Sequence, residues 1–236
     1  MRVDMGENWL GRATQRVKAW ERRVSWSFGD DISTPAGRRA AWRHFHLVDH
    51  AFVRLLWTNL HEIAPGAWRA NQPSPRRIGA YARMGIRSII SLRGDASWSY
   101  TLFEREACAQ HRVTLHLTHL GARKLATREK LLHLLHLFDT VERPFLMHCK
   151  SGADRTGLAA ALFLLDQQGA SLERARAELH WRYLHRKGSK AGILDHLLDV
   201  YEAESDGGRM SVRQWIETCY DPARLTDSFR AERATR

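Results

Sequence analysis

A ten-residue segment in the second half of the chain, residues 148–157, constrains the fold more than any other part of the sequence. It reads HCKSGADRTG and lies between a short apolar run at 144–147 and a longer Ala/Leu-rich run at 158–165. The first run has the length of a buried strand, and the second has the length and composition of a buried helix. A strand, a tight glycine-containing loop and a helix start turn backbone N–H groups and the positive end of the helix toward one point. The segment therefore predicts an anion-binding loop at the edge of an α/β sheet.

The residue types inside this loop indicate the chemistry. A cysteine at a helix N-terminus, with a cation nearby, ionises more easily than a free thiol, whose pKa is about 8.5. An arginine presents a planar fork that binds two oxygens of one phosphate. We therefore expect Cys149 to be a thiolate nucleophile beneath a phosphate that Arg155 holds. Cys108 and Cys219 lack this context and are interpreted as small buried hydrophobes.

The same residues carry a resemblance to a known family. The segment resembles the signature loop of the protein-tyrosine-phosphatase superfamily, His-Cys-x5-Arg-Thr/Ser-Gly, and the resemblance extends over about 60–205. It is most similar to the small atypical dual-specificity and bacterial branch. Domains of that branch often begin with a segment like 65–73 and contain a glycine-led strand ending in Leu-Arg, as at 85–93. The resemblance implies a cysteine-phosphatase fold and a reaction that passes through a cysteinyl-phosphate.

The resemblance also implies a role for each residue of the loop. Cys149 and Arg155 are expected to be catalytic, and the phosphate is expected to contact Lys150, Ser151, Gly152, Ala153, Asp154 and Arg155. His148 is expected to fix the loop by hydrogen bonding, and Thr156 to place its hydroxyl near the sulfur. No metal and no cofactor are expected, because the loop dipoles and Arg155 supply the positive field.

The general acid departs from the common pattern of the family. Many relatives take an aspartate from a mobile loop that here corresponds to 119–124, and this segment contains no carboxylate. Asp154, just before Arg155, and Asp95, after a predicted strand, are the two replacements. The alternative roles are a loop-stabilising acceptor for Asp154 and a turn or cap residue for Asp95. Asp154 ranks first because covalent geometry limits its distance from the phosphate.

The substrate is less constrained than the reaction. Phosphotyrosine protein and phosphorylated lipid or inositol both fit a loop of this kind. Lys150 resembles a lysine of some phosphoinositide phosphatases and would favour a polyanion, or else it is a solvent-facing residue at the rim. Arg93, Arg123 and Lys124 would widen the positively charged mouth of the phosphate-binding site. A phosphate-binding module without turnover is the alternative function, against which the intact pair of cysteine and arginine argues.

The rest of the chain predicts an α/β fold with a central, mostly parallel sheet flanked by helices. The predicted strands are 67–70, 86–92, 113–119 and 144–148. The predicted helices are 75–84, 101–111, 127–141, 156–168, 171–185 and 190–204, with an earlier one running from Pro35 toward Trp57. We expect a basic helical extension at 1–45, a catalytic domain at 46–205 and a tail at 206–236 that docks on the domain.

Charge and composition limit the partners. The net charge is +11, and the excess is mostly arginine spread along the chain rather than gathered in a nucleic-acid-binding motif, so no nucleic acid is expected. Trp9, Ala13, Val17, Trp20 and Val24 recur at helical spacing among basic residues. This pattern is typical of a helix packed on the domain or of one that lies on an anionic membrane. The three cysteines and the absence of an apolar leader predict a cytoplasmic protein, with any membrane contact at the surface.

Overall fold

The computed structural model describes residues 29–206 and 209–235, which form two compact units. The first contains residues 29–53 with 97–103, and the second contains 54–96, 104–206 and 209–235. The predicted amphipathic helix that begins near Trp9 lies outside the described residues. The predicted boundary after residue 45 falls inside the first unit. Among the described residues, none of the helices has both the length and the apolar character needed to span a bilayer.

The first unit is a small helical body. Helix α2 (Pro35–Arg43) begins at the N-cap Thr34, whose hydroxyl accepts from the Gly37 N–H. The helix predicted to continue toward Trp57 is instead interrupted. A π-helical turn (His44–Val48) follows α2, and a 3-10 helix (Ala51–Leu55) comes after His50, whose φ of 55° ends the helical run. Ala41, Phe45, Ala51 and Phe103 pack together in a cluster of their own.

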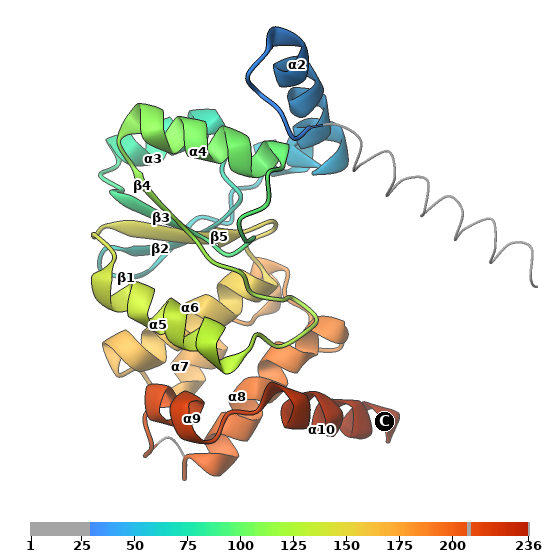
Figure 1. The fold of residues 1–236 in the computed structure, drawn as a ribbon. Helices are drawn as coiled ribbons and strands as arrows, with labels where there is room; N and C mark the ends of the chain where they lie inside the picture. Colours follow the sequence, from blue (N-terminus) through green and yellow to red (C-terminus); the bar gives the residue numbers. More distant parts are fainter. Residues whose placement is uncertain (1–28, 207–208, 236) are drawn as a thin grey trace, which may run out of the picture. The chain divides into compact units, whose positions relative to one another are not determined.

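The second unit is built on a five-stranded sheet in the order β1-β2-β5-β3-β4 (Figure 1). The strands are β1 (His61–Ala64), β2 (Ala67–Asn71), β3 (Ser88–Ser91), β4 (Thr114–Leu117) and β5 (Phe145–Cys149). β1 pairs antiparallel with β2, and the other three pairings are parallel. The predicted α/β class is confirmed. β1 is the strand that sequence reasoning missed, because it is short and exposes two of its four side chains at the sheet edge.

Side chains of β5 alternate between the two faces of the sheet, as the pleat requires. Phe145, Met147 and Cys149 belong to the core cluster under α5 (Arg128–Thr140) and α6 (Asp154–Gln168). Leu146 belongs to the opposite cluster, with α3 (Pro75–Arg83) and α4 (Ser99–His111). The two helix pairs therefore cover opposite faces of the sheet (Figure 1). Because Cys149 and His148 are neighbours on one strand, their side chains point to opposite faces of the sheet.

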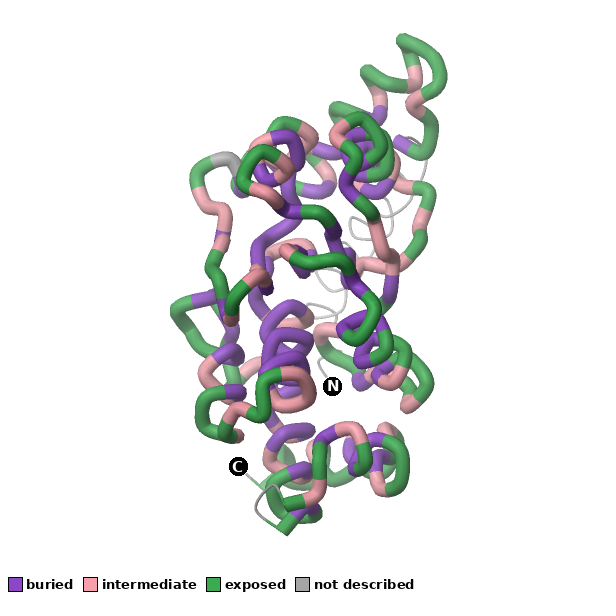
Figure 2. Tube along the Cα trace, turned by 90° about the vertical axis from the view of Figure 1, so that its left-hand side faces the viewer, coloured by how far each residue is buried: buried purple, intermediate pink, exposed green. Residues whose placement is uncertain are grey.

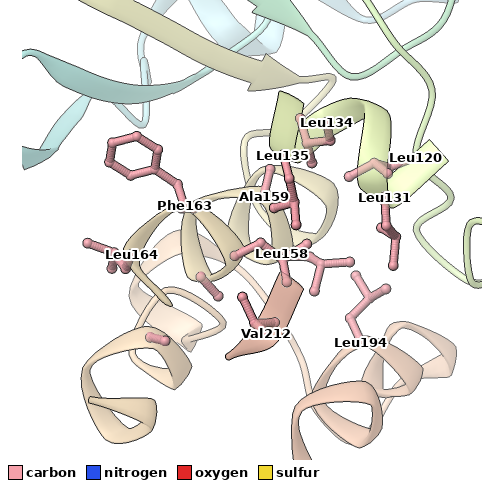
Figure 3. Packing of buried hydrophobic residues seen from close by; sticks show 14 of the residues in the cluster. Leu120, Leu131, Leu134, Leu135, Leu158, Ala159, Phe163, Leu164, Leu194 and Val212 are labelled. Atoms are coloured by element: carbon pink, nitrogen blue, oxygen red, sulfur yellow. The ribbon is translucent and has the colours of Figure 1, made fainter. Parts of the chain in front are cut away.

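Helix α6 is enclosed, which explains its apolar composition. Its residues 156–164 are all buried, and Leu158 and Ala159 pack among leucines of α5 and residues of the helices that follow (Figure 3). Buried residues continue along β2, β3, β5 and the inner helices, whereas exposed ones gather in loops and on outer helix faces (Figure 2). α6 ends at Gly169, in the left-handed conformation that glycine adopts readily (φ 56°).

The helix predicted at 171–185 is wrong in its second half. α7 covers only Leu172–Arg176, and the chain then turns through a 3-10 helix (Trp181–Tyr183) to Leu184, whose φ is 67°. Glu178, Tyr183 and His185 are all buried. A continuous helix would not turn these three side chains inward together, and their polar partners inside the domain stabilise the irregular path instead.

The last helices form a further layer against α6. A short 3-10 turn (Lys190–Gly192) leads into α8 (Ile193–Glu204), followed by α9 (Val212–Thr218) and α10 (Pro222–Ala234). Trp215 of α9 is fully buried between Tyr201 and Tyr220, and its indole N–H donates to Glu204 at 2.8 Å. The tail therefore contributes large aromatic side chains to the same core cluster as α6.

Replacing Trp215 with alanine should lower the free energy of unfolding by about 3–5 kcal/mol, because a large buried ring is removed and a cavity remains. Urea unfolding followed by circular dichroism measures the change. Trp181→Ala is the matched control, since that side chain is 73% exposed and its loss should change stability by less than about 0.5 kcal/mol. Equal unfolding midpoints for the two variants would contradict a docked tail.

Candidate active site

The loop 150–153 joins the end of β5 to the start of α6. Gly152 lies at its centre with φ 72°, and a Cβ there would come within 2.6 Å of the Ala70 carbonyl oxygen. The neighbouring atoms belong to the backbone of β2 and cannot give way as a flexible side chain could. This position therefore requires glycine for both backbone conformation and space.

Cys149 is buried at the mouth of this loop, only 1% exposed. Burial raises the pKa of its thiol, but the charge of Arg155 and hydrogen bonds from Thr156 and the backbone N–H of Gly152 lower it by more. The net result is a pKa below the ordinary cysteine value, which favours the thiolate. By contrast, burial together with Glu104 raises the pKa of Cys108. The surroundings of these two thiols therefore shift their pKa values in opposite directions.

The groups around the sulfur complete the loop. Thr156 is fully buried, its hydroxyl lowers the pKa of Cys149, and this hydroxyl has no oxygen or nitrogen partner among the described residues. Nε of Arg155 is buried and likewise has no protein partner within the described residues. His148 points to the opposite face of the sheet, where its Nε2 lies 2.5 Å from Oε1 of Glu104. His148 therefore anchors the end of β5 to α4 and does not face the sulfur.

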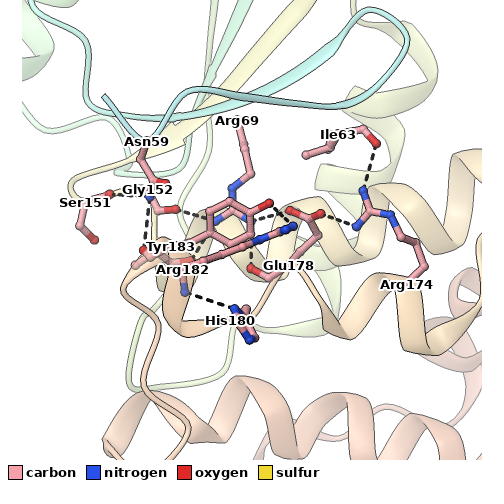
Figure 4. Close-up of polar contacts among 11 residues, drawn as sticks. Asn59, Ile63, Arg69, Ser151, Gly152, Arg174, Glu178, His180, Arg182 and Tyr183 are labelled. Atoms are coloured by element: carbon pink, nitrogen blue, oxygen red, sulfur yellow. Dashed lines mark hydrogen bonds and ion pairs between the residues drawn. The ribbon is translucent and has the colours of Figure 1, made fainter. Parts of the chain in front are cut away.

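A fully buried arginine lies beside the loop and supports it (Figure 4). Arg69 of β2 donates through Nη2 to the Gly152 carbonyl at 2.7 Å, and through Nη1 to Oε2 of Glu178 at 2.6 Å. Its guanidinium carbon also lies 3.6 Å from the centre of the Tyr183 ring. Glu178 accepts a second donor, Arg174, on its other oxygen at 2.6 Å. Since Arg69 holds the carbonyl of Gly152, the N–H of the same peptide group, that of Ala153, points to the opposite side.

Two asparagines tie neighbouring segments to the same loop. Asn59 donates through Nδ2 to the carbonyls of Ser151 (3.2 Å) and Tyr183 (3.3 Å). Asn71, which lies opposite Cys149 in the sheet register, donates to the carbonyl of Trp57. The Gln72 N–H donates to the Lys150 carbonyl at 3.3 Å. The loop is therefore fixed by β2, by the segment 57–59 and by the segment 178–185.

The two candidate acids lie in different surroundings. Asp154 is the first residue of α6, and its Oδ1 lies 2.7 Å from Nδ1 of His185. Asp95 is on an exposed turn after β3, where Arg105 donates to its Oδ1 at 2.5 Å. Segment 119–124 forms a turn with buried Leu120 and exposed Arg123 and Lys124. The sequence therefore leaves no carboxylate in this turn to supply an acid.

The remaining predicted residues line or flank the loop. Lys150 and Ser151 are partly exposed, and Ala153 is buried just before α6. Arg93 follows β3 and donates to the Gln72 side chain at 3.1 Å, which links it to the segment beside Lys150. In the described part of the chain, no group of three or more His, Cys, Asp or Glu side chains is arranged to hold a metal ion.

Comparison with known proteins agrees with this geometry. A family model described as "Tyrosine phosphatase family" matches residues 109–174, which include the whole loop. The dual specificity protein phosphatase TpbA of Pseudomonas aeruginosa is 28% identical over 182 residues, covering 76% of this chain and 74% of the relative. The same protein from a second strain of that species is 29% identical over 181 residues.

The predicted resemblance to the protein-tyrosine-phosphatase superfamily is therefore confirmed. The chain is a phosphatase of the tyrosine and dual-specificity type.

Solved structures show the same fold. The crystal structure of P. aeruginosa TpbA aligns with a TM-score of 0.52 at 22% identity, covering 65% of this phosphatase and 91% of that chain. A putative phosphatase from Shewanella putrefaciens CN-32 aligns with a TM-score of 0.50 at 16% identity, covering 62% and 90%.

Sequence reasoning missed the residues that support the loop from a distance. These are Arg69, Glu178, His185 and Asp195. Arg69 could have been noticed as a charged residue inside a predicted strand that is otherwise apolar. The others lie in predicted helices, where charged residues are common and carry no signal.

Replacing Arg69 with methionine should destabilise the phosphatase by about 3 kcal/mol, because Glu178 loses its buried partner and keeps only the part-exposed Arg174. The double variant R69M/E178L should regain most of the stability but still bind vanadate weakly, because the Gly152 carbonyl lacks its donor. Chemical unfolding and vanadate inhibition measure the two effects. Arg105→Met, which breaks the exposed pair with Asp95, is the control and should change stability by less than about 1 kcal/mol. Full recovery of vanadate affinity in the double variant would show that Arg69 does not shape the loop.

Proposed function

We propose that the phosphatase hydrolyses phosphomonoesters through a cysteinyl-phosphate on Cys149. The thiolate attacks phosphorus, and the ester P–O bond breaks as the leaving oxygen takes a proton from Asp154. Water then attacks the phosphorus, the S–P bond breaks, and the thiolate leaves with support from the Thr156 hydroxyl. Arg155 and the N–H groups of 150–155 bind the non-bridging oxygens as charge shifts between them.

One observation supports this proposal more strongly than any other observation does. Cys149 has a lowered pKa, and it lies beside an arginine whose buried Nε has no partner in the described part of the protein. A buried N–H without a partner is costly, and Arg155 as a whole is only half-buried, so an anion can reach its guanidinium beside the thiolate and satisfy it. A tetrahedral phosphate supplies oxygens for the arginine and an electrophilic centre for the sulfur.

Asp154 is the general acid in this scheme. Its position at the start of α6 keeps it adjacent to Arg155, and its side chain is 28% exposed, so that a substrate can reach it. The carboxylate of Asp95 is instead paired with Arg105 on an exposed turn. Asp95 serves as a turn residue.

The substrate class follows from the relative and from charge. The name of TpbA, a dual specificity protein phosphatase, supports phosphotyrosine protein as the substrate. Lys150 beside the nucleophile and the net charge of +11 are equally compatible with a phosphorylated lipid or inositol. A basic extension that contacts anionic membrane would bring the enzyme to such a lipid. We place the reaction in a reducing compartment such as the cytoplasm, because it requires a free thiolate.

Cys149→Ser should abolish turnover of an aryl phosphate while leaving phosphate binding within a few-fold of the wild type. The hydroxyl is a far poorer nucleophile than the thiolate, whereas Arg155 and the loop are unchanged. Steady-state assays with and without a metal chelator measure turnover, and calorimetry with inorganic phosphate measures binding. Turnover near the wild-type rate in this variant would exclude the cysteinyl-phosphate. The matched control is Cys108→Ser, which should retain activity.

Asp154→Asn should lower kcat/KM for phosphotyrosine about 10²–10⁴-fold and remove the basic limb of the pH–rate profile, because the leaving oxygen then departs unprotonated. Asp95→Asn should retain both the rate and the limb. The measurement is kcat/KM across pH for the two variants. The opposite pattern would assign the acid to Asp95.

A further inference from the structure

Behind the signature loop, three side chains form a linear hydrogen-bonded chain. Asp154 Oδ1 lies 2.7 Å from Nδ1 of His185, and Nε2 of the same ring lies 2.7 Å from Oδ2 of Asp195 on α8. The His185 side chain is 1% exposed and the Asp195 side chain 10%, whereas Asp154 at the loop is 28% exposed. His185 is therefore the most enclosed member of the chain, and Asp154 is the member most open to solvent.

Both ring nitrogens of His185 face carboxylate oxygens, so each must carry a hydrogen if both carboxylates are ionised. Burial lowers the pKa of His185, but hydrogen bonds and charge interactions with Asp154 and Asp195 outweigh it and raise the pKa to about 9. At neutral pH the ring is an imidazolium. Because both nitrogens contact oxygen directly, the group has no room for a metal ion between its members.

No other charged side chain described around His185 competes for its protons. Its segment also carries Arg182, which donates to the Tyr183 hydroxyl at 2.5 Å, and Lys187, which pairs with Asp199 at 3.5 Å. Arg186, the next residue, is exposed. From α6 and α8, the facing groups are Asp154 and Asp195 themselves.

We propose that His185, oriented by Asp195, is a positioning residue that supplies Asp154 with the proton it gives to the leaving group. This inference rests on the proposed function, in which Asp154 is the general acid. A general acid that acts once per turnover needs a proton source, and Nδ1 of a buried imidazolium is in direct contact with its carboxylate.

The protons balance over one turnover. As the P–O bond breaks, the proton on Nδ1 moves to Asp154, and Asp154 gives a carboxyl proton to the leaving oxygen. His185 is then neutral and keeps its Nε2 hydrogen on Asp195. When water attacks the cysteinyl-phosphate, it gives a proton back through Asp154 to Nδ1 as the S–P bond breaks. The thiolate and the imidazolium are both restored, and the net reaction is hydrolysis.

A relay and a purely structural clamp differ in how the rate depends on the leaving group. Loss of a relay slows esters whose leaving oxygen needs a proton and spares those whose leaving group departs as a stable anion. Loss of a structural clamp disturbs the loop and slows all esters alike.

The experiment compares His185→Gln with the wild type on kcat/KM for a series of aryl phosphates, from phosphotyrosine to 2,4-dinitrophenyl phosphate. We expect a loss of about 10²-fold on phosphotyrosine, less than about 3-fold on the dinitrophenyl ester, and a descending pH limb moved to lower pH by about 2 units. Vanadate affinity should be unchanged. Equal losses on all esters, or no change in the limb, would overturn the relay.

Two further variants keep the test decisive. Asp195→Asn leaves the histidine in place but removes the carboxylate beyond it, and it should move the same limb in the same direction by a smaller amount. His196→Gln, on α8 and bonded to Ser228 at 2.8 Å, is the matched control and should behave as the wild type. If His185→Gln does not fold, an unmoved limb in Asp195→Asn refutes the relay.

The outcomes separate this inference from the proposed function. An inactive Cys149→Ser variant together with an unchanged His185→Gln variant would remove the relay and keep the cysteinyl-phosphate. Activity in Cys149→Ser would remove the cysteinyl-phosphate itself.

Discussion

The buried guanidinium of Arg69 is the interaction on which the site depends. It is fully enclosed and holds a carbonyl of the signature loop on one side and Glu178 on the other. A cation removed from water is retained only when its hydrogen bonds are satisfied and its charge is balanced. Here the groups that satisfy it are backbone and carboxylate oxygens from segments far apart in the sequence. Fixing one charge therefore fixes how β2, the loop and segment 178–185 lie with respect to one another.

The irregular segment after α7 is the second consequence of this arrangement. It meets the loop through Tyr183, whose ring stacks on Arg69, and again through His185, which contacts Asp154. A regular helix would offer such contacts on one stripe only, with the others directed to solvent. Loss of helical hydrogen bonds over 177–185 is offset by polar contacts that reach the site. The segment thus supports the loop as well as connecting two helices.

How far the sequence predicts this structure depends on the range of each interaction. The strand, loop and helix around Cys149 follow from local patterns, and so do α3, α5 and the buried strands, which the structure places close to the predicted ranges. β1 was not predicted, because a short, polar edge strand has no periodic hydrophobic pattern. The irregular conformation of 177–185 was not predicted, because Glu178 and His185 are held by partners on β2, α6 and α8. Such long-range pairs leave no trace in local spacing. The nucleophile and arginine are therefore predictable from sequence, whereas the residues that set their geometry are not.

The alternation along β5 limits how this strand can change. Odd-numbered positions face α5 and α6 and end with the sulfur, while Leu146 and His148 face α3 and α4. A change in strand length by one residue would exchange the two sets. The sulfur would then face the carboxylate of Glu104, and an imidazole would face Arg155. Only an insertion or deletion of two residues keeps each side chain on its own face of the sheet. The length of this strand should therefore differ by an even number of residues among phosphatases of this architecture.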